Sequence, residues 1–406
     1  MGVCCRGVSL ILIKGDLQCP YQCLYCYQSP TRRHSRLPRL DLEAVERAVR
    51  KLYSTNKQPI VVHGGEPLLY PVETLERLFK LSYELTGKCS IQTSGFLLRD
   101  VHLELFKKYK VSVGLSIDGP WPVNRLRGSG DLENRKRQTE HVLQYLEEMV
   151  AERIPVSVIS VAHSGNLVDE GRELFKQWML SLDRLGVTGR FNPVGTDDTS
   201  IAPSLEVFKE GYLDILRFQL EKGVRLWSPY RDMLNSLLGS GNVVCVFREC
   251  DPYCTPSATT VFGDGSVGVC VRLYGGRVYL RDTRQLDVRS RVLRQTDCAG
   301  CEYWEHCKGG CCGLAVDWDW RNKDRYCEVY KAIFKVFSRM LRSLGLQETR
   351  REVKPREAKS TPGVDHTDGV EHLDGAWRHL DSNLVSGHSD GIEHLDGGWR
   401  HLDSSA

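Results

Sequence analysis

Short apolar runs alternate with amphipathic stretches from residue 8 to about residue 195. The apolar runs predict six β-strands, at Val8–Ile13, Ile60–His63, Lys88–Gln92, Val111–Ile117, Val156–Val161 and Thr188–Phe191. Apolar residues at helical spacing predict helices at Asp41–Tyr53, Glu73–Leu85, Asn134–Ala151 and Leu167–Leu185. Such alternation predicts an α/β fold of six parallel units, an open, partial (β/α)6 TIM-like barrel. Active sites of such barrels lie at the carboxyl ends of the strands.

The pattern changes at about residue 240, where cysteines become dense and periodicity fades. We therefore expect the barrel to span 1–235 and a small cysteine-rich domain to span 236–345. An amphipathic helix at Val329–Leu344 is expected to close that domain. Residues 346–364 are charged and punctuated by proline, which is typical of a linker, and 365–406 form a tail.

Composition sets limits on location and partners. The net charge of +3 gives no indication of nucleic-acid binding, and no apolar run has the roughly 18–20 residues that a membrane span needs. No signal-peptide pattern is present, so a cytoplasmic location is expected. Sixteen cysteines are unusual there, because disulfides are rare in a reducing compartment. Metal binding or catalysis is the more common use of such cysteines.

The first cysteine group is the sequence CPYQCLYCY, which follows the first predicted strand and contains Cys19, Cys23 and Cys26. Three thiolates on one short loop can bind three irons of a [4Fe–4S] cluster and leave the fourth iron open. A structural zinc site would need a fourth protein ligand. Zinc binding and simple buried thiols are the alternatives that the spacing leaves open.

Further motifs follow in order along the chain: GGEP after the second strand, QTSG after the third, and SIDGP after the fourth. With the three cysteines, they make residues 8–330 resemble the radical S-adenosylmethionine (SAM) superfamily. The resemblance implies that SAM contacts Tyr27, Gly64, Gly65, Glu66, Ser94, Ser116, Asp118 and Arg127. Arg127 is the residue that we expect at the SAM carboxylate.

The resemblance also implies a reaction. A reduced cluster passes one electron to SAM, which breaks into methionine and a 5′-deoxyadenosyl radical, while the protein supplies position and excludes water. A one-electron reductant such as flavodoxin or ferredoxin is implied as a partner.

Eight more cysteines have the spacing C-x3-C-x15-C, then C-x2-C-x5-C-x3-C, then a last cysteine. This plan resembles the SPASM extension of radical SAM peptide maturases, which implies two auxiliary [4Fe–4S] clusters and three in all. By that resemblance, auxiliary cluster I takes Cys250, Cys254, Cys270 and Cys311, and auxiliary cluster II takes Cys298, Cys301, Cys307 and Cys327. Two structural zinc sites, or one open cluster that lacks Cys250, remain alternatives. Ordinary thiols are expected at Cys4, Cys5, Cys89, Cys245 and Cys312.

The resemblance to SPASM enzymes implies a peptide substrate. In anaerobic sulfatase maturases of this group an Asp that acts as a base follows the third SPASM cysteine, whereas Val271 and Arg272 follow Cys270 here. That difference disfavours formylglycine formation on a separate protein, and no catalytic acid or base is assigned. A non-catalytic iron–sulfur electron carrier is a third alternative, but a carrier has no use for an open iron.

The tail contains one motif twice, at 366–382 and 388–404, and holds six of the twelve histidines. Relatives that join an aromatic ring to the Cβ two positions later suggest cyclophane cross-links in its HLD and WRH triplets. The candidate residues are His372, Asp374, Trp377, His379, Asp381, His394, Asp396, Trp399, His401 and Asp403. We hypothesise that the tail is a peptide substrate fused in cis, since tethering raises effective concentration. Only about 18 residues precede Cys19, so no leader-binding module is expected. A metal-binding tail and a passive disordered tail are the alternatives.

Overall fold

The computed structural model describes residues 10–15, 18–29, 40–55, 57–240, 245–247, 250, 258–270, 272–273 and 288–348. The chain divides into two units, Met1–Glu352 and Val353–Ala406, and every described residue belongs to the first. Cys254 and the tail residues from His372 to Asp403 therefore lie outside the described residues.

All six predicted strands are present, which confirms the α/β fold class. They are β1 (Ile11–Lys14), β2 (Ile60–His63), β3 (Cys89–Thr93), β4 (Val111–Ser116), β5 (Val156–Ala162) and β6 (Gly189–Pro193). Each pairs in parallel with the next. Two strands that the sequence did not predict extend the sheet beyond β1. β7 (Thr259–Phe262) pairs with β1 in parallel, and β8 (Val267–Gly268) pairs with β7 in antiparallel.

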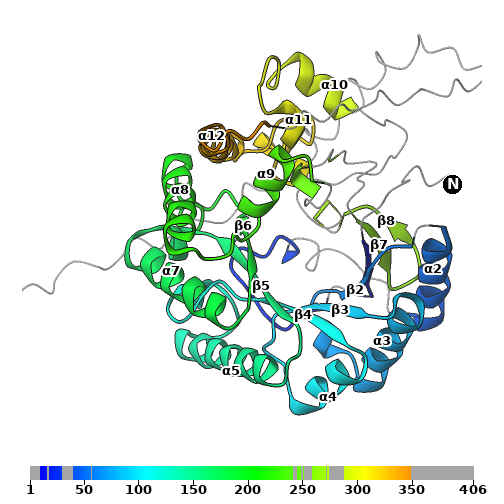
Figure 1. Ribbon diagram of the computed structural model, residues 1–406. Coiled ribbons are helices and arrows are strands. Elements are labelled where there is room, and N and C mark those ends of the chain that lie inside the picture. The colour runs from blue at the N-terminus through cyan, green and yellow to red at the C-terminus, as the bar shows by residue number, and fades with distance from the viewer. Residues whose placement is uncertain are drawn as a thin grey trace, which may run out of the picture. The chain divides into compact units, whose positions relative to one another are not determined.

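The long helices between the strands lie on the outer side of the curved sheet (Figure 1). The predicted helices are present, with ends within a few residues of the expected ones. The α-helices between the strands are α2 (Leu42–Thr55), α3 (Val72–Thr86), α4 (Asp100–Lys108), α5 (Leu132–Ala151), α6 (Ser164–Leu167) and α7 (Asp169–Arg184), and those after β6 are α8 (Leu205–Lys222), α9 (Tyr230–Leu237), α10 (Val288–Gln295), α11 (Trp304–Cys307) and α12 (Cys327–Ser343).

Local sequence explains these elements. β1 is buried on both faces, as a central strand of a parallel sheet requires, and its residues are nearly all apolar. Asp131 caps α5 by accepting a hydrogen bond from the backbone N–H of Asn134 at 2.8 Å. Gly87 ends α3 at φ 72°, a left-handed conformation that glycine adopts without steric cost.

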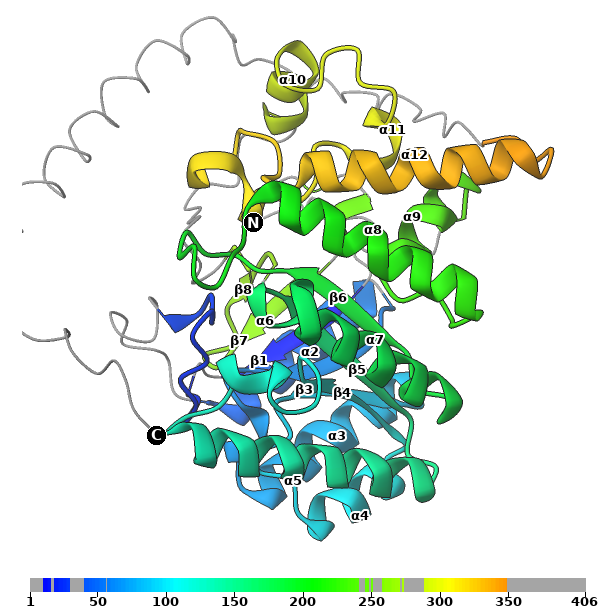
Figure 2. The ribbon, with the colours of Figure 1, turned by 90° about the vertical axis from the view of Figure 1, so that its left-hand side faces the viewer.

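The cysteine-rich segment contributes to the barrel sheet and packs against the barrel's helices. β7 joins the main sheet, and α12 packs against α8 and α9, as the view in Figure 2 shows for α8. The Tyr326 hydroxyl donates to the carbonyl of Val194 at 2.7 Å, which ties the start of α12 to the segment after β6. In the described part of the chain, no helix has both the length and the apolar character for crossing a membrane.

Candidate active site

Three loops meet at the carboxyl edge of the sheet, and backbone hydrogen bonds join them. The loop after β1 carries Cys19, Cys23 and Cys26. The carbonyl of Gln18, at its start, accepts a hydrogen bond from the N–H of Glu66 in the loop after β2, at 2.8 Å. Leu24 donates through its N–H to the carbonyl of Leu126, in the segment after β4, at 2.9 Å. The three-cysteine loop is thus fixed to the GGEP loop and to the segment that carries Arg127.

The Glu66 carboxylate links the ends of β2 and β3. It is 2% exposed and accepts hydrogen bonds from the backbone N–H of Leu68 at 3.1 Å and of Ser94 at 2.9 Å. The hydroxyls of Thr93 and Ser94 donate to it as well. The side chains of Glu66 and Ser94, both expected at SAM, are thus bound to each other. Glu66 shapes the loop, in which Gly64 is buried and Gly65 is half-buried directly after β2.

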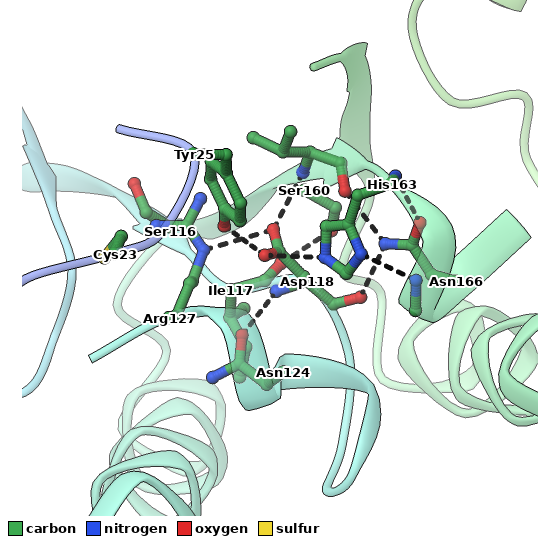
Figure 3. A network of polar contacts seen from close by, with 12 residues as sticks. Cys23, Tyr25, Ser116, Ile117, Asp118, Asn124, Arg127, Ser160, His163 and Asn166 are labelled. Carbon is green, nitrogen blue, oxygen red and sulfur yellow. Dashed lines mark hydrogen bonds and ion pairs between the residues drawn. The ribbon is translucent and has the colours of Figure 1, made fainter. Parts of the chain in front are cut away.

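A buried polar network centres on Asp118, the second residue after β4 (Figure 3). One carboxylate oxygen lies 3.1 Å from Arg127 Nε and accepts from the N–H of Val161 at 2.8 Å. The other lies 3.2 Å from His163 Nε2 and accepts a short hydrogen bond from the Tyr25 hydroxyl. Burial alone would raise the pKa of Asp118, but Arg127, His163 and Tyr25 outweigh it and lower that pKa to about 2. Asp118 is therefore a buried anion.

This network contacts the three-cysteine loop and holds it in place. Tyr25 lies between Cys23 and Cys26 in sequence, and its hydroxyl is bound to Asp118. The Arg127 guanidinium lies 5.4 Å from the Tyr25 ring centroid, and the N–H of Gly128 donates to Cys23 Sγ at 3.4 Å. Hydrogen bonds to cluster sulfurs influence reduction potential, so this segment can tune a bound cluster as well as position it.

The sequence predicted Asp118 and Arg127 but not their buried partners, Tyr25 and His163. Asp118 has no exposed surface, so it acts on the site through Arg127 and Tyr25. His163 directly follows β5, at the same edge of the sheet as the other residues, and this position was the available signal. Tyr25 had a signal too, because it lies inside the cysteine motif.

The two remaining predicted SAM contacts, Tyr27 and Ser116, also lie at this edge. Ser116 accepts a hydrogen bond from the Gln92 side chain at 2.8 Å. Tyr27 is half-buried, and Lys14 Nζ and the Arg272 guanidinium carbon each lie 5.9 Å from its ring centroid. Arg272, from the cysteine-rich segment, therefore lies beside the residue that follows Cys26.

The four cysteines expected at auxiliary cluster II gather at one place. Burial raises the pKa of Cys307 to about 12, and the charges of Cys327, Cys301 and Cys298 act on it in addition. All four are described residues, yet no three His, Cys, Asp or Glu side chains of the described chain converge on a single-ion site. An all-sulfur set fits an iron–sulfur cluster, and four thiolates also satisfy the zinc alternative.

Three of the four cysteines expected at auxiliary cluster I are described. Cys250 is buried and Cys270 is half-buried, with Cys270 Sγ accepting from the N–H of Arg272 at 3.4 Å. Cys311 is buried, and its N–H donates to the Asp324 carboxylate at 2.9 Å. The donors fit an iron–sulfur cluster in kind, since soft thiolates select such clusters. Cys312, which the spacing left out, is also buried here.

One buried arginine joins the loops that carry both sets of cysteines. Arg289 is 2% exposed, and its guanidinium donates to five backbone carbonyls. The donations are from Nε to Trp320 at 2.8 Å, from Nη1 to Cys250 at 3.5 Å and Lys308 at 3.2 Å, and from Nη2 to Gly309 at 2.9 Å and Asn322 at 3.1 Å. No carboxylate of the described residues pairs with it. Burial raises the pKa of the Asp324 carboxyl to about 6, and the positive charge of Arg289 opposes that rise.

The chain is similar to known proteins in sequence. Residues 17–177 match the model of the radical SAM superfamily. A Methanothermobacter thermautotrophicus protein is 35% identical over 127 residues, which are 30% of this chain and 47% of that protein. The cysteine-type anaerobic sulfatase-maturating enzyme of Clostridium perfringens is 24% identical over 370 residues, which are 82% of this chain and 97% of the enzyme.

Solved structures agree with the fold. The structure of anSMEcpe with bound AdoMet superposes with a TM-score of 0.65 at 20% identity, covering 83% of this chain and 99% of the other. Streptococcus suis SuiB bound to its precursor peptide SuiA superposes with a TM-score of 0.55 at 14% identity, covering 79% and 76%. The three-cysteine loop and the strand edge that carries Glu66, Asp118 and Arg127 all lie within the segment that matches the radical SAM superfamily, and the chain as a whole is similar to an anaerobic sulfatase-maturating enzyme.

Proposed function

We propose that this protein modifies a peptide side chain by hydrogen-atom abstraction, using SAM and three [4Fe–4S] clusters. The observation that carries the proposal is the hydrogen-bonded carboxyl edge of the sheet. There, a loop with three cysteines is fixed to the GGEP loop through Gln18 and Glu66, and to the Arg127 segment through Leu24. An edge held in this way can position a cofactor against a substrate.

The chain's own residues bind and orient. When bound, a reduced cluster with SAM supplies a 5′-deoxyadenosyl radical. Asp118 holds the Nε side of Arg127 at 3.1 Å, which fixes the guanidinium beside the loop where the SAM carboxylate is proposed to bind. Glu66 holds Ser94 and the backbone of the GGEP loop, and the buried Tyr25 keeps water from the base of the three-cysteine loop.

The proposal of a peptide substrate is supported by the relatives. anSMEcpe is known with AdoMet and the Cp18Cys peptide bound, and SuiB with the precursor peptide SuiA. Both resemble this chain over more than three quarters of its length. A separate one-electron donor, such as a flavodoxin or ferredoxin, is proposed to reduce the clusters.

The proposed reaction is cross-linking within the tail. Each HLD and WRH triplet places an aromatic ring two residues before an acceptor Cβ, as at His372 and Asp374 or Trp377 and His379. Abstraction of a Cβ hydrogen and attack of that carbon on the ring form one C–C bond. The product loses two hydrogen atoms: one goes to 5′-deoxyadenosine, and the other leaves as a proton and an electron, for which an auxiliary cluster held by the cysteine-rich segment would be the acceptor.

Anaerobic incubation of the reconstituted full chain with SAM and dithionite tests this proposal. We expect 5′-deoxyadenosine by chromatography and a tail lighter by two hydrogen atoms per cross-link by mass spectrometry. The control replaces Cys19, Cys23 and Cys26 with alanine and should give neither product. Absence of 5′-deoxyadenosine from cluster-loaded protein would overturn the enzyme class. An unmodified tail beside steady SAM cleavage would overturn the tail as substrate alone.

A second candidate is formylglycine formation on a separate protein. The similarity to the Clostridium perfringens sulfatase-maturating enzyme covers nearly that enzyme's whole length. Val271 and Arg272, which stand where those maturases carry an Asp base, weigh against it. A peptide with a sulfatase-type cysteine or serine distinguishes the two, because formylglycine is an aldehyde that a hydrazide probe captures.

A further inference from the structure

We infer that His63, the last residue of β2, is the base that takes up the proton released when the proposed cross-link forms. The sequence assigned no catalytic acid or base, and it indicated His63 only as the end of a strand. The inference rests on the cross-linking reaction proposed above, and it names the residue that this reaction still lacked.

His63 lies on the inner face of the curved sheet. Successive residues of a strand point to opposite faces, and Val62 has no exposed surface and belongs to the main core, which contains the buried side chains of the outer helices α2 and α3. Val61 instead packs against a separate small cluster, and Cys270 packs against the same cluster. His63, two residues after Val61, therefore shares the inner face with it, at the carboxyl end of β2.

The strand next to His63 reaches the junction of two cysteine-bearing segments. Lys14 of β1 is the register partner of His63. Lys14 Nζ and the Arg272 guanidinium carbon each lie 5.9 Å from the centroid of the Tyr27 ring. Tyr27 belongs to the three-cysteine loop, and Arg272 belongs to the cysteine-rich segment. His63 is thus beside the junction of the segments that are proposed to hold the SAM-binding cluster and auxiliary cluster I.

One hydrogen bond fixes the tautomer of the His63 ring. Nδ1 lies 3.2 Å from the carbonyl oxygen of Gly64. A carbonyl oxygen only accepts, so Nδ1 carries the ring proton and Nε2 keeps its lone pair. Within the described ranges, Nε2 has no hydrogen-bond partner. Nε2 is therefore the nitrogen that can accept a proton from a substrate.

Burial and a neighbouring charge keep the ring neutral. Burial of the ring and then the positive charge of Lys14 lower the pKa of His63 to about 4, although the hydrogen bond to Gly64 opposes the shift. The ring is therefore neutral at pH 7 and able to take up a proton. Because Lys14 disfavours the charged ring, the proton is held only briefly before it passes to water.

The proposed reaction releases a proton that a weak base can accept. Attack of the substrate Cβ radical on the aromatic ring forms the C–C bond and leaves one hydrogen on the attacked ring carbon. Loss of that hydrogen restores the aromatic ring, so it leaves readily as a proton and an electron. Nε2 of His63 takes the proton, and auxiliary cluster I would be the acceptor of the electron.

The first experiment compares His63→Gln with the wild-type full chain after anaerobic reconstitution with SAM and dithionite. We expect cross-linking to slow about a hundredfold while SAM cleavage continues, so more 5′-deoxyadenosine forms per cross-link. Iron content and SAM binding in equilibrium dialysis should equal those of the wild type. The matched control is His141→Gln, a half-buried histidine on the outer helix α5, which should behave as the wild type.

Added imidazole separates a base from a merely structural residue. It should restore part of the cross-linking in His63→Ala, where the ring has been removed, and have no effect in His63→Gln, where the space is filled. Equal rates of cross-linking in His63→Gln and the wild type would overturn the inference. So would loss of iron from His63→Gln, which would indicate a structural role.

Nuclear magnetic resonance of the chain with ¹⁵N-labelled histidine tests the tautomer without any turnover. The His63 signal is identified by its absence from His63→Gln, and at pH 7 it should show a protonated Nδ1 and a bare Nε2. A protonated Nε2 would overturn the inference even in an active enzyme. An unmodified tail in wild type that cleaves SAM would instead overturn the proposed cross-linking, and the inference with it.

Discussion

Replacing Asp118 with asparagine should destabilise the protein by about 3 kcal/mol. The asparagine would keep the shape of the side chain and an oxygen for the N–H of Val161, but it would remove the negative charge. Arg127, whose side chain is 10% exposed, would then be a buried cation without its anion. Removal of one member of a buried ion pair typically costs about 3–5 kcal/mol, and the retained hydrogen bonds place this case at the lower end.

The pKa of Asp118 gives a second route to the magnitude. The pKa falls from 3.8 to about 2 in the folded protein, which corresponds to roughly 2–3 kcal/mol of stabilisation of the carboxylate. Since the folded-state pKa is the lower one, this stability is fully present above pH 3.8 and is lost as pH falls through about 2. At neutral pH the substitution therefore removes all of it.

The assay is urea unfolding of the reconstituted full chain under argon, followed by far-UV circular dichroism. The matched control is Asp183→Asn, which breaks the more exposed Asp183–Arg225 pair at 2.7 Å and should cost under about 1 kcal/mol. SAM binding, measured by equilibrium dialysis, should weaken about tenfold in Asp118→Asn, because Arg127 and Tyr25 lose their anchor. Equal unfolding midpoints for the two variants would refute the reasoning.

Three further predictions concern other parts of the fold. Glu66→Gln should weaken SAM binding several-fold in equilibrium dialysis while the iron content stays that of the wild type, because the lost charge loosens Ser94; unchanged binding would contradict this role. Burial lowers the pKa of His102 from 6.5 to about 4, so the wild type loses stability as pH drops below 6.5. Between pH 7 and pH 5, the free energy of unfolding of His102→Gln, measured in urea, should therefore fall by about 2 kcal/mol less than that of the wild type. Equal losses in the two proteins would exclude His102 as the cause. Gly310→Ala should lower the melting temperature more than Gly300→Ala. Both glycines have positive φ, but only at Gly310 would a new Cβ clash with a neighbour, at 2.5 Å from Asp324. Equal shifts in melting temperature would rule out the steric argument.

The sequence predicted the barrel well because each βα unit is encoded locally. The strand Ile60–His63 was predicted to the residue. β7 was missed because Thr259–Phe262 lies in a segment without periodicity, and its partner β1 is more than two hundred residues away. Pairing over that separation depends on the assembled sheet and leaves no local pattern in the chain.

The sequence predicted which residues lie at this edge of the sheet, but not how their side chains pair. Motif order brought Glu66, Ser94, Asp118 and Arg127 to one edge, yet it did not indicate that Glu66 binds Ser94 or that Asp118 binds Arg127. Those partnerships depend on side-chain direction, which spacing does not encode. The same limit applies to the contact between Cys250 and Cys312, which a count of intervening residues could not indicate.

Arg289 has a consequence for how the cysteine-rich segment can vary. Among the described residues, its guanidinium binds main-chain oxygens, from Trp320, Asn322, Lys308, Gly309 and Cys250. Substitutions of the side chains at 308, 320 and 322 therefore leave this junction intact, because every residue type offers the same carbonyl. Lysine in place of Arg289 could not make all five hydrogen bonds, because an ammonium has three N–H donors and the planar guanidinium has five. The side chains around Arg289 can therefore vary, whereas Arg289 itself cannot be replaced without loss of these hydrogen bonds.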